Sequence, residues 1–236
     1  MERTSELSSP VAEVGAALGA VVAAGFGALA WLRGGVKALH PRGVVTGGRL
    51  TPVDHAPTGV EWADDLVETQ VVVRSSRSAG LPSPLPDIIG LALRIPLRDD
   101  GFGDLLLASS RAEPVLRYLA VPRVSVAGAY TSLLPFATPA GLRLVAALPG
   151  AGPGEYWLAV GSSTGDWTRF AILTVDEDAT PDADSHGPGD DEPIDFEPVG
   201  NQLPGLVIPE PLGRFRRPSY AASRGQRGRK VASAED

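Results

Sequence analysis

A succession of short strand-like segments between residues 43 and 175 is the feature that most constrains the fold. Each segment is rich in apolar and β-branched residues and ends at Gly, Pro, Asp or Ser. Alternation is clear in RVSVAGAY and TRFAILTV, so we expect one face of each strand to be buried and the other to meet solvent. Eight such segments at near-regular spacing predict a β-barrel or a β-sandwich. The predicted segments are 43–53, 66–76, 88–97, 103–110, 121–136, 141–149, 155–163 and 167–175.

Residues 11–32 give the one strong helical signal. The uncharged part, 14–32, has the length of a membrane-spanning helix, but Ala, Gly and Val dominate it and only three Leu occur. We therefore expect a helix that packs on the domain or on a partner, and membrane contact through residues 14–32 is the second interpretation. The segment 108–120 is expected to hold one or two helical turns.

Charge is segregated in the second half of the chain. Ten carboxylates and no Lys or Arg lie in residues 176–198, which predicts a solvated acidic loop, while residues 213–230 carry seven basic residues. We divide the chain into an apolar helix (1–36), a barrel (37–175), the acidic loop (176–198) and a C-terminal segment whose basic tail packs on the barrel (199–236). The tail is interpreted as an electrostatic arm or a counter-charge to the acidic loop, and no nucleic-acid partner is expected.

Several classes of chemistry are disfavoured by what the sequence lacks. The chain has no cysteine, which excludes disulfides, thiolate metal sites and a cysteine nucleophile, and favours a cytoplasmic location. Its three histidines, His40, His55 and His186, are scattered, and no phosphate-binding glycine loop, HExxH motif or nucleophile elbow occurs. Hydrolytic metal chemistry is therefore disfavoured.

Three stretches, in order along the chain, resemble the haem-binding barrel of the catalase family. KALHPRG is similar to the basic residue, histidine and glycine with which that barrel begins. VVVRSSRSAGLPSPLPDIIGLALRIP resembles the following Arg and Ser, a loop and an Asp-x-x-Gly-x-Ala-x-Lys stretch, and GDLLLASS resembles the next strand. The matching positions are Lys37, His40 and Gly43; Arg74, Ser76, Asp87, Gly90, Ala92 and Arg94; and Asp104.

A fourth similarity lies in the basic tail, in RRPSY. Catalases ligate haem iron with a tyrosinate, and this resemblance assigns that ligand to Tyr220, with Arg216 four residues earlier and Arg227 seven residues later. Residues at i and i+4 meet on one helix face, and a guanidinium beside a phenol stabilises the phenolate. Pro218 restricts such a helix to its first turn at this point.

The resemblance implies an α+β, mostly β fold: a closed antiparallel β-barrel of about eight strands, with an N-terminal helix and a short C-terminal helical segment. It implies a b-type haem, which we expect to fill the interior of the barrel, with Tyr220 as the metal ligand. Lys37, Arg74, Arg216 and Arg227 would bind the cofactor, and His40 and Ser76 would be catalytic. A structural role for His40, bonded to backbone between helix and strand, is the alternative.

The departures from the family pattern bear on activity. Ala108 stands where the family has a distal asparagine, and Ser75 stands where an aromatic residue precedes the distal serine. We expect peroxidase-type activity on peroxide or organic hydroperoxides, with weak or no catalase activity, because the group that would orient the peroxide is missing. The alternative is a non-catalytic barrel that binds haem or another apolar ligand. A homo-oligomer is compatible with either function.

Overall fold

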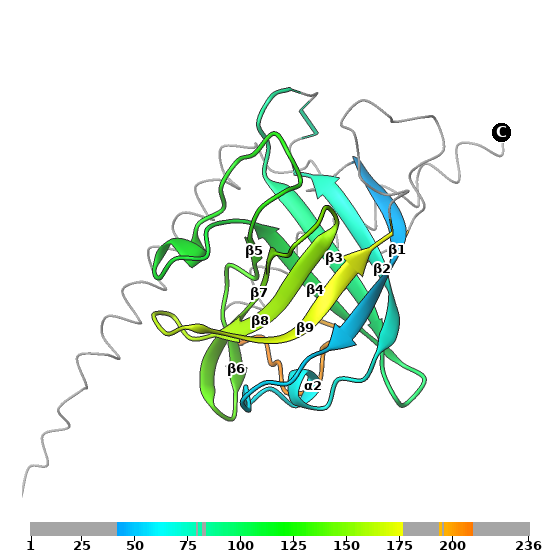
Figure 1. The fold of residues 1–236 in the computed structure, drawn as a ribbon, viewed down its shortest axis with the longest axis vertical. Helices are drawn as coiled ribbons and strands as arrows, with labels where there is room; N and C mark the ends of the chain where they lie inside the picture. The colour runs from blue at the N-terminus through cyan, green and yellow to red at the C-terminus, as the bar shows by residue number, and fades with distance from the viewer. Residues whose placement is uncertain (1–41, 79, 82–83, 177–193, 195, 210–236) are drawn as a thin grey trace, which may run out of the picture. The chain divides into compact units, whose positions relative to one another are not determined.

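The computed structural model describes residues 42–78, 80–81, 84–176, 194 and 196–209, all of them within the compact unit Ala38–Asp236 (Figure 1). This part of the chain is almost entirely β. Its helical elements are one short α-helix, α2 (Glu61–Asp64), and one 3-10 helix, η1 (Leu116–Tyr118). Its strands are β1 (Arg42–Pro52), β2 (Thr69–Arg77), β3 (Ile89–Pro96), β4 (Phe102–Ser109), β5 (Tyr130–Thr131), β6 (Phe136–Thr138), β7 (Gly141–Pro149), β8 (Glu155–Gly161) and β9 (Trp167–Val175).

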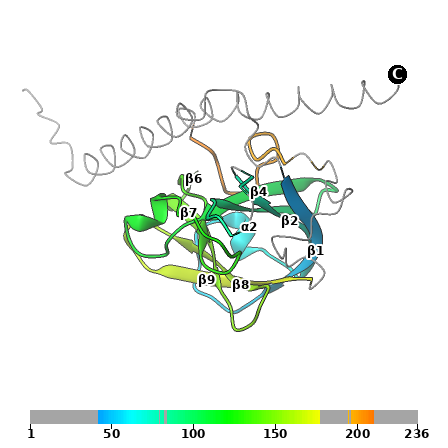
Figure 2. The same cartoon turned by 90° about the horizontal axis from the view of Figure 1, so that it is seen from above.

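Eight of these strands form a closed antiparallel barrel (Figures 1 and 2). β1 pairs with both β2 and β9, so the first and last long strands lie side by side. The ring closes through the two residues of β5, because Tyr130 pairs with Ser109 of β4 on one side and with Ala147 of β7 on the other. β6 extends the sheet beside the start of β7. Closure leaves no long edge strand in the ring.

The inside of the barrel is a packed hydrophobic core. Successive side chains of a strand point to opposite faces, and in β2, β3 and β4 the odd-numbered positions are the buried apolar ones. An eight-stranded barrel has an interior just wide enough for its own side chains to fill. The inward side chains form one contiguous cluster, which includes Leu50, Val71, Val73, Leu91, Leu93, Leu105, Leu107, Leu158 and Leu173, each no more than 5% exposed.

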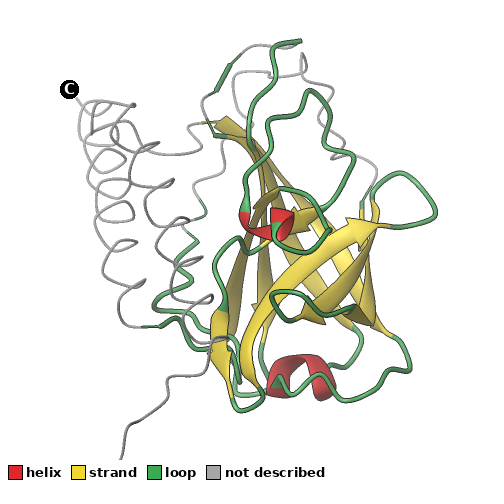
Figure 3. Cartoon of the chain, turned by 90° about the vertical axis from the view of Figure 1, so that its left-hand side faces the viewer, coloured by secondary structure: helices red, strands yellow, loops and turns green. Residues whose placement is uncertain are grey.

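The helix α2 lies at one end of the barrel (Figure 3), and residues 196–209, which we call the strap, pass beside it (orange in Figure 1). Trp62 of α2 packs edge-on against Phe170, with ring centroids 5.2 Å apart. The backbone amide of Trp62 donates to the carbonyl of Pro204 in the strap at 3.0 Å. Leu203 and Leu206 of the strap are buried in the core. The strap is therefore part of the folded barrel.

The other end is closed by the loops that follow β2 and β4. The guanidinium of Arg77 donates to the carbonyls of Leu81, Leu85 and Val124, which ties the two loops together. Ala112 and Ala129 of the second loop pack on Ala146, Leu148 and Ala159, which lie on the outside of β7 and β8. The guanidinium of Arg117, in the same loop, is almost fully buried and lies 4.3 Å from the ring centroid of Trp167 in β9. Part of the outer surface of β7 and β8 is thus covered by the chain itself.

The predicted closed antiparallel barrel, mostly β, is confirmed, and segments 141–149 and 167–175 coincide with β7 and β9. The prediction of one strand over 121–136 is wrong, since only Tyr130 and Thr131 pair in the ring. The alternating residues before them form a loop whose one ladder contact is the bridge between Arg123 and Asp87. The predicted N-terminal helix, the C-terminal helical segment and the 14–32 run lie outside the described residues.

Candidate functional site on the outer face of the barrel

The residues that resemble the catalase pattern in the described part of the chain share one surface, the outside of β1 to β4. The strand register aligns them in three rows across the four strands. Because the period of a strand is two, each row points away from the packed interior. We call this surface the outer face; its rows are Gly43, Ser76, Gly90 and Ala108; Val45, Arg74, Ala92 and Leu106; and Gly47, Val72, Arg94 and Asp104.

Small residues make the first row of the outer face flat. It contains two glycines, an alanine and a serine, and Gly43, Ser76 and Gly90 are buried while Ala108 is partly exposed. Adjacent strands lie about 4.8 Å apart, so the row extends over roughly 14 Å, and the residues of the row itself carry only small side chains. A surface of this shape suits the broad side of a planar apolar molecule.

Arg74 contributes a cation to this surface. It stands in the second row, half-buried, and its guanidinium extends toward β1, where a Cβ added at Gly43 would lie 2.8 Å from Cζ and from Nη2. The guanidinium therefore occupies space that is open because residue 43 has no side chain. Arg74 and Ser76 each already have an interaction partner.

Arg94 and Asp104 end the outer face with a buried ion pair. Oδ1 of Asp104 accepts from Arg94 Nε at 2.8 Å, and Oδ2 accepts from Arg94 Nη2 at 2.9 Å. Oδ2 also accepts from the amide of Glu197 and from Asn201 Nδ2, both at 2.8 Å. The Arg94 guanidinium lies over the rings of Phe102 and Phe196, at 4.2 and 5.0 Å from their centroids. This arrangement, which we call the Asp104 clasp, attaches the strap to β3 and β4.

The expectation that a flat cofactor fills the barrel interior is wrong. A cavity large enough for a porphyrin would leave the surrounding side chains uncovered, whereas the inward side chains of the ring form a core that is almost fully buried. Arg74 and Ser76 lie on the opposite side of the sheet from that core. A ligand that contacts them must lie outside the barrel.

Of the predicted site residues, Arg74 and Ser76 lie in the described part of the chain, on the same face of β2, and the matched positions Gly43, Gly90 and Ala92 lie beside them. Asp87 lies at the end of this surface, bridged to Arg123 in the loop that precedes β5. The other predicted site residues, Lys37, His40, Arg216, Tyr220 and Arg227, lie outside the described residues.

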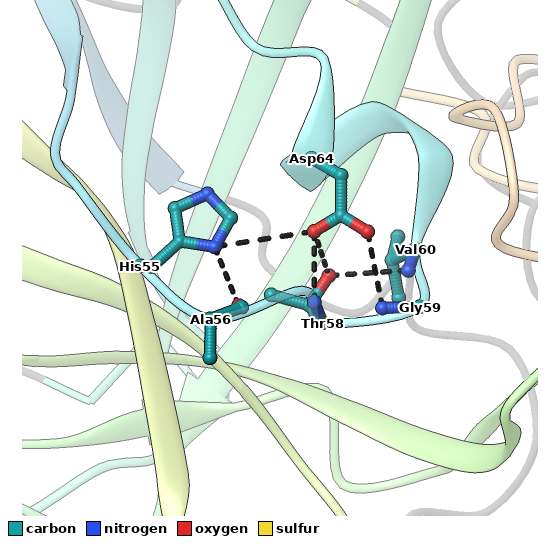
Figure 4. Close-up of polar contacts among 6 residues, drawn as sticks. All are labelled: His55, Ala56, Thr58, Gly59, Val60 and Asp64. Carbon is teal, nitrogen blue, oxygen red and sulfur yellow. Dashed lines mark hydrogen bonds and ion pairs between the residues drawn. The ribbon is translucent and has the colours of Figure 1, made fainter.

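A second polar cluster, which the sequence did not predict as a site, lies around Asp64 (Figure 4). Oδ1 of Asp64 accepts from the amide and the hydroxyl of Thr58, both at 2.8 Å, and Oδ2 accepts from the amide of Gly59 at 3.1 Å. Burial alone raises the pKa of Asp64. The hydrogen bonds from Thr58 and Gly59 and the nearby His55 together lower it by more, so the pKa lies below its ordinary value. The carboxylate thereby holds the loop that enters α2.

His55 lies beside this carboxylate. Its Nδ1 is 2.8 Å from the carbonyl oxygen of Ala56 and 4.0 Å from Asp64 Oδ1, and its ring packs edge-on against Phe170. Because Nδ1 donates to the Ala56 carbonyl, the imidazole is oriented by backbone and sits too far from Asp64 for a direct hydrogen bond. This cluster stabilises the loop between β1 and α2. The short spacing of Thr58 and Asp64 is the sequence signal that could have indicated it.

Tyr130 and Tyr156 form a buried pair at the loop-covered end of the barrel. Their rings are 5.8 Å apart in an edge-on arrangement, and both hydroxyls donate to the carbonyl of Val126. Burial raises the pKa of both phenols above the ordinary value, and each lies in the core with its oxygen bonded to backbone. Neither of them is therefore suited to act as a tyrosinate ligand.

Within the described residues, no three His, Asp or Glu side chains are grouped so that they could hold a metal ion, and no helix is long and apolar enough to cross a membrane. A closed eight-stranded barrel does not by itself identify a catalase-like family. No protein-family model matches the sequence, and no curated protein matches it significantly.

Proposed function

We propose that the outer face of β1 to β4 binds haem and that the protein is a peroxidase-type haem protein with weak or no catalase activity. The observation that carries this proposal is the alignment, in adjacent rows of one sheet face, of the residues that resemble the catalase pattern. Residues at every second position of one strand share a face because of the strand period alone, so the informative point is that all four strands present the matched residues on the same side of the sheet.

The described residues supply two chemical features that such a ligand would use. Gly43, Gly90 and Ala108 give a flat apolar surface, and Arg74 gives a planar guanidinium whose fork matches a carboxylate. Haem has a flat apolar body and carries carboxylates at one edge. Bound haem would supply the iron for peroxide chemistry.

Each remaining role belongs to a residue of this chain. Arg74 and Lys37 would bind carboxylates of the cofactor, as would Arg227. Tyr220 would hold the metal, and Arg216, four residues earlier in the sequence, would favour its ionised form. His40 would accept a proton from the peroxide and return it to the leaving oxygen, with Ser76 as a polar neighbour.

The alternative is a haem carrier that does not consume peroxide. Ala108 favours it, because this residue occupies the first row beside Gly90, where a polar side chain would orient a peroxide. An imidazole that acts without such a partner loses much of its catalytic advantage. The two functions differ in turnover and share the same binding surface.

The test is reconstitution of the purified full chain with haemin, followed by the Soret absorption and by peroxide consumption. Ala92→Trp would place an indole in the middle row and should abolish the Soret shift, whereas Thr174→Trp, an exposed position on β9, should leave it unchanged. Tyr220→Phe should alter the spectrum, and His40→Ala should leave the spectrum and remove peroxide consumption. A wild-type chain without a Soret shift, or an Ala92→Trp variant with the wild-type spectrum, refutes the proposal. A Soret shift without peroxide consumption supports the carrier.

A further inference from the structure

We infer that the end of the barrel at which the loops 78–88 and 121–129 lie docks on a lipid bilayer. The described residues of these loops expose six leucine, proline and valine side chains, which we call the crown: Leu81, Pro84, Leu85, Pro86, Pro122 and Val124. β1 begins at this end, and β2 and β4 end there, as the strand register shows (Figure 1). The crown is not part of the outer face, so this inference does not depend on haem binding.

Three aliphatic side chains dominate the crown. Leu81, Leu85 and Val124 are 41%, 50% and 49% exposed. They belong to two loops that are distant in sequence, but one guanidinium connects them. Arg77 Nε donates to the carbonyl of Leu81 at 3.0 Å, Nη1 donates to that of Val124 at 3.4 Å, and Nη2 donates to that of Leu85. The exposed residues therefore form one apolar patch, the kind of surface that marks a protein or membrane contact.

The backbone beneath the crown is suited to a medium of low polarity. Carbonyl and amide groups that meet lipid without a hydrogen-bond partner are costly, and the three carbonyls that accept from Arg77 avoid that cost. Asp87 and Arg123 exchange backbone hydrogen bonds of 2.9 and 2.8 Å between the two loops. The Asp87 carboxylate is buried and accepts from the amides of Ile88 and Leu81. The described residues of these loops thus expose no carboxylate.

The two ends of the barrel differ in charge. The loops 53–68 and 97–101, at the α2 end, carry seven carboxylates and one arginine: Asp54, Glu61, Asp64, Asp65, Glu68, Asp99, Asp100 and Arg98. At the crown end, the described residues of the two loops carry Arg123 and the buried Asp87, and Arg77 lies beside them. An anionic lipid surface attracts basic residues and repels carboxylates. The charge of these loops therefore favours docking by the crown end.

The sequence before β1 supports a bilayer, rather than a protein, as the occupant. Residues 14–32 lie outside the described part of the chain; their sequence is an uncharged run of 19 residues, long enough to span a bilayer. Nine residues, 33–41, separate this run from the start of β1 at the crown end, and nine residues extend over at most about 32 Å. Arg33 and Lys37 in this interval are suited to anionic headgroups. A domain tethered so closely needs only weak affinity of its own, because its docking is intramolecular.

The experiment uses the absence of cysteine from the chain, which permits a single label. Full-length Leu85→Cys and Val124→Cys, each labelled with the polarity-sensitive dye NBD, are mixed with vesicles of phosphatidylcholine and phosphatidylglycerol. Both labels should shift their emission to shorter wavelength and should be quenched by doxyl-labelled lipid. Leu142→Cys is the matched control, because Leu142 is 51% exposed and lies at the start of β7, toward the other end of the barrel. Its label should keep the spectrum it has in buffer.

A charge introduced into the crown separates docking by the barrel from anchoring by residues 14–32. Leu85→Asp, added to the chain labelled at position 124, should abolish the emission shift, because its carboxylate would have to enter the lipid interface. Leu142→Asp, added to the same labelled chain, should leave the shift unchanged. Far-UV circular dichroism checks that both variants keep the wild-type fold.

Three results would overturn the inference. The first is a chain that does not bind the vesicles. The second is a chain that floats with the vesicles while the labels at 85 and 124 keep their spectra in buffer, since residues outside the crown would then make the contact. The third is an emission shift that appears without vesicles and grows with protein concentration, which would show that a second copy of the chain covers the crown.

Discussion

Asp104 offers the most direct test of how the barrel is held together. Its carboxylate is fully buried and accepts four hydrogen bonds, two from Arg94 and two from the strap, and its amide donates to the carbonyl of Asn201 at 2.8 Å. We predict that Asp104→Asn and Asp104→Leu both destabilise the chain, the second more than the first.

The magnitudes follow from the donors that each variant leaves without an acceptor. An asparagine can keep its carbonyl oxygen where three donors converge, and its amide then faces Arg94 Nε, so one charge-assisted bond is lost at about 1.5–3 kcal/mol. A leucine accepts nothing and leaves the guanidinium of Arg94 without its carboxylate, a loss of about 3–5 kcal/mol for a buried pair. Arg94 is 22% exposed, which favours the lower end of that range.

Urea denaturation followed by far-UV circular dichroism measures these differences. Asp54→Asn, at an exposed position in the loop after β1, serves as the control and should stay within about 0.5 kcal/mol of the wild-type free energy of unfolding. If Asp104→Leu unfolds at the wild-type urea midpoint, the clasp contributes nothing and the reasoning is refuted. A larger loss of unfolding free energy in Asp104→Asn than in Asp104→Leu would also contradict the reasoning, which assumes that the asparagine oxygen still accepts hydrogen bonds.

Three further perturbations have defined outcomes. The folded-state pKa of Asp64 is below the ordinary value of 3.8, so the carboxylate stabilises the fold above that pH and loses this effect as the pH falls through the folded-state pKa. The difference in unfolding free energy between wild type and Asp64→Asn, measured by urea titration, should therefore shrink below about pH 4. Gly205→Ala should lower the free energy of unfolding by at least about 1–2 kcal/mol in a thermal scan, since Gly205 has φ +77° and an added Cβ would lie 2.6 Å from the amide nitrogen of Glu61. A variant as stable as wild type would contradict the close contact between the strap and α2. Arg117→Met should lower the free energy of unfolding by about 3 kcal/mol, because the carbonyls of Ser162 and Gly165 lose the guanidinium that donates to them; the carbonyl of Ala112 keeps its hydrogen bond from Trp167 Nε1. An unchanged melting temperature would contradict this reasoning.

Local sequence signals predicted the strands that are bounded by clear turn residues. β7 and β9 begin and end where Gly, Pro and Asp interrupt alternating apolar residues, so their limits were visible in the sequence. The segment before Tyr130 alternates equally well, but it forms a loop because Arg123 pairs with Asp87 and Val124 is left exposed. Alternation indicates that a segment could be a strand, and pairing partners decide whether it is one.

The long-range contacts could not be predicted in this way. Asp104 joins Glu197 and Asn201, which lie 93 and 97 residues away, and nothing in the intervening sequence indicates that meeting. Phe196 and Glu197 fall within the predicted acidic loop, although Phe196 packs on Arg94 and Glu197 donates to Asp104. Contacts of this kind depend on the closed topology of the barrel, which brings the strap back to β4.

The position of the proposed site follows from the strand period together with the size of the barrel. An eight-stranded barrel uses its inward side chains to fill its own interior, so positions such as Leu91 and Leu93 cannot serve a large ligand. Residues 74 and 76 on β2, and 90 and 92 on β3, have the opposite parity and must point outward. A pattern of residues at every second position can therefore build a site on one side of the sheet only, and in this chain that side is the outer face of the barrel.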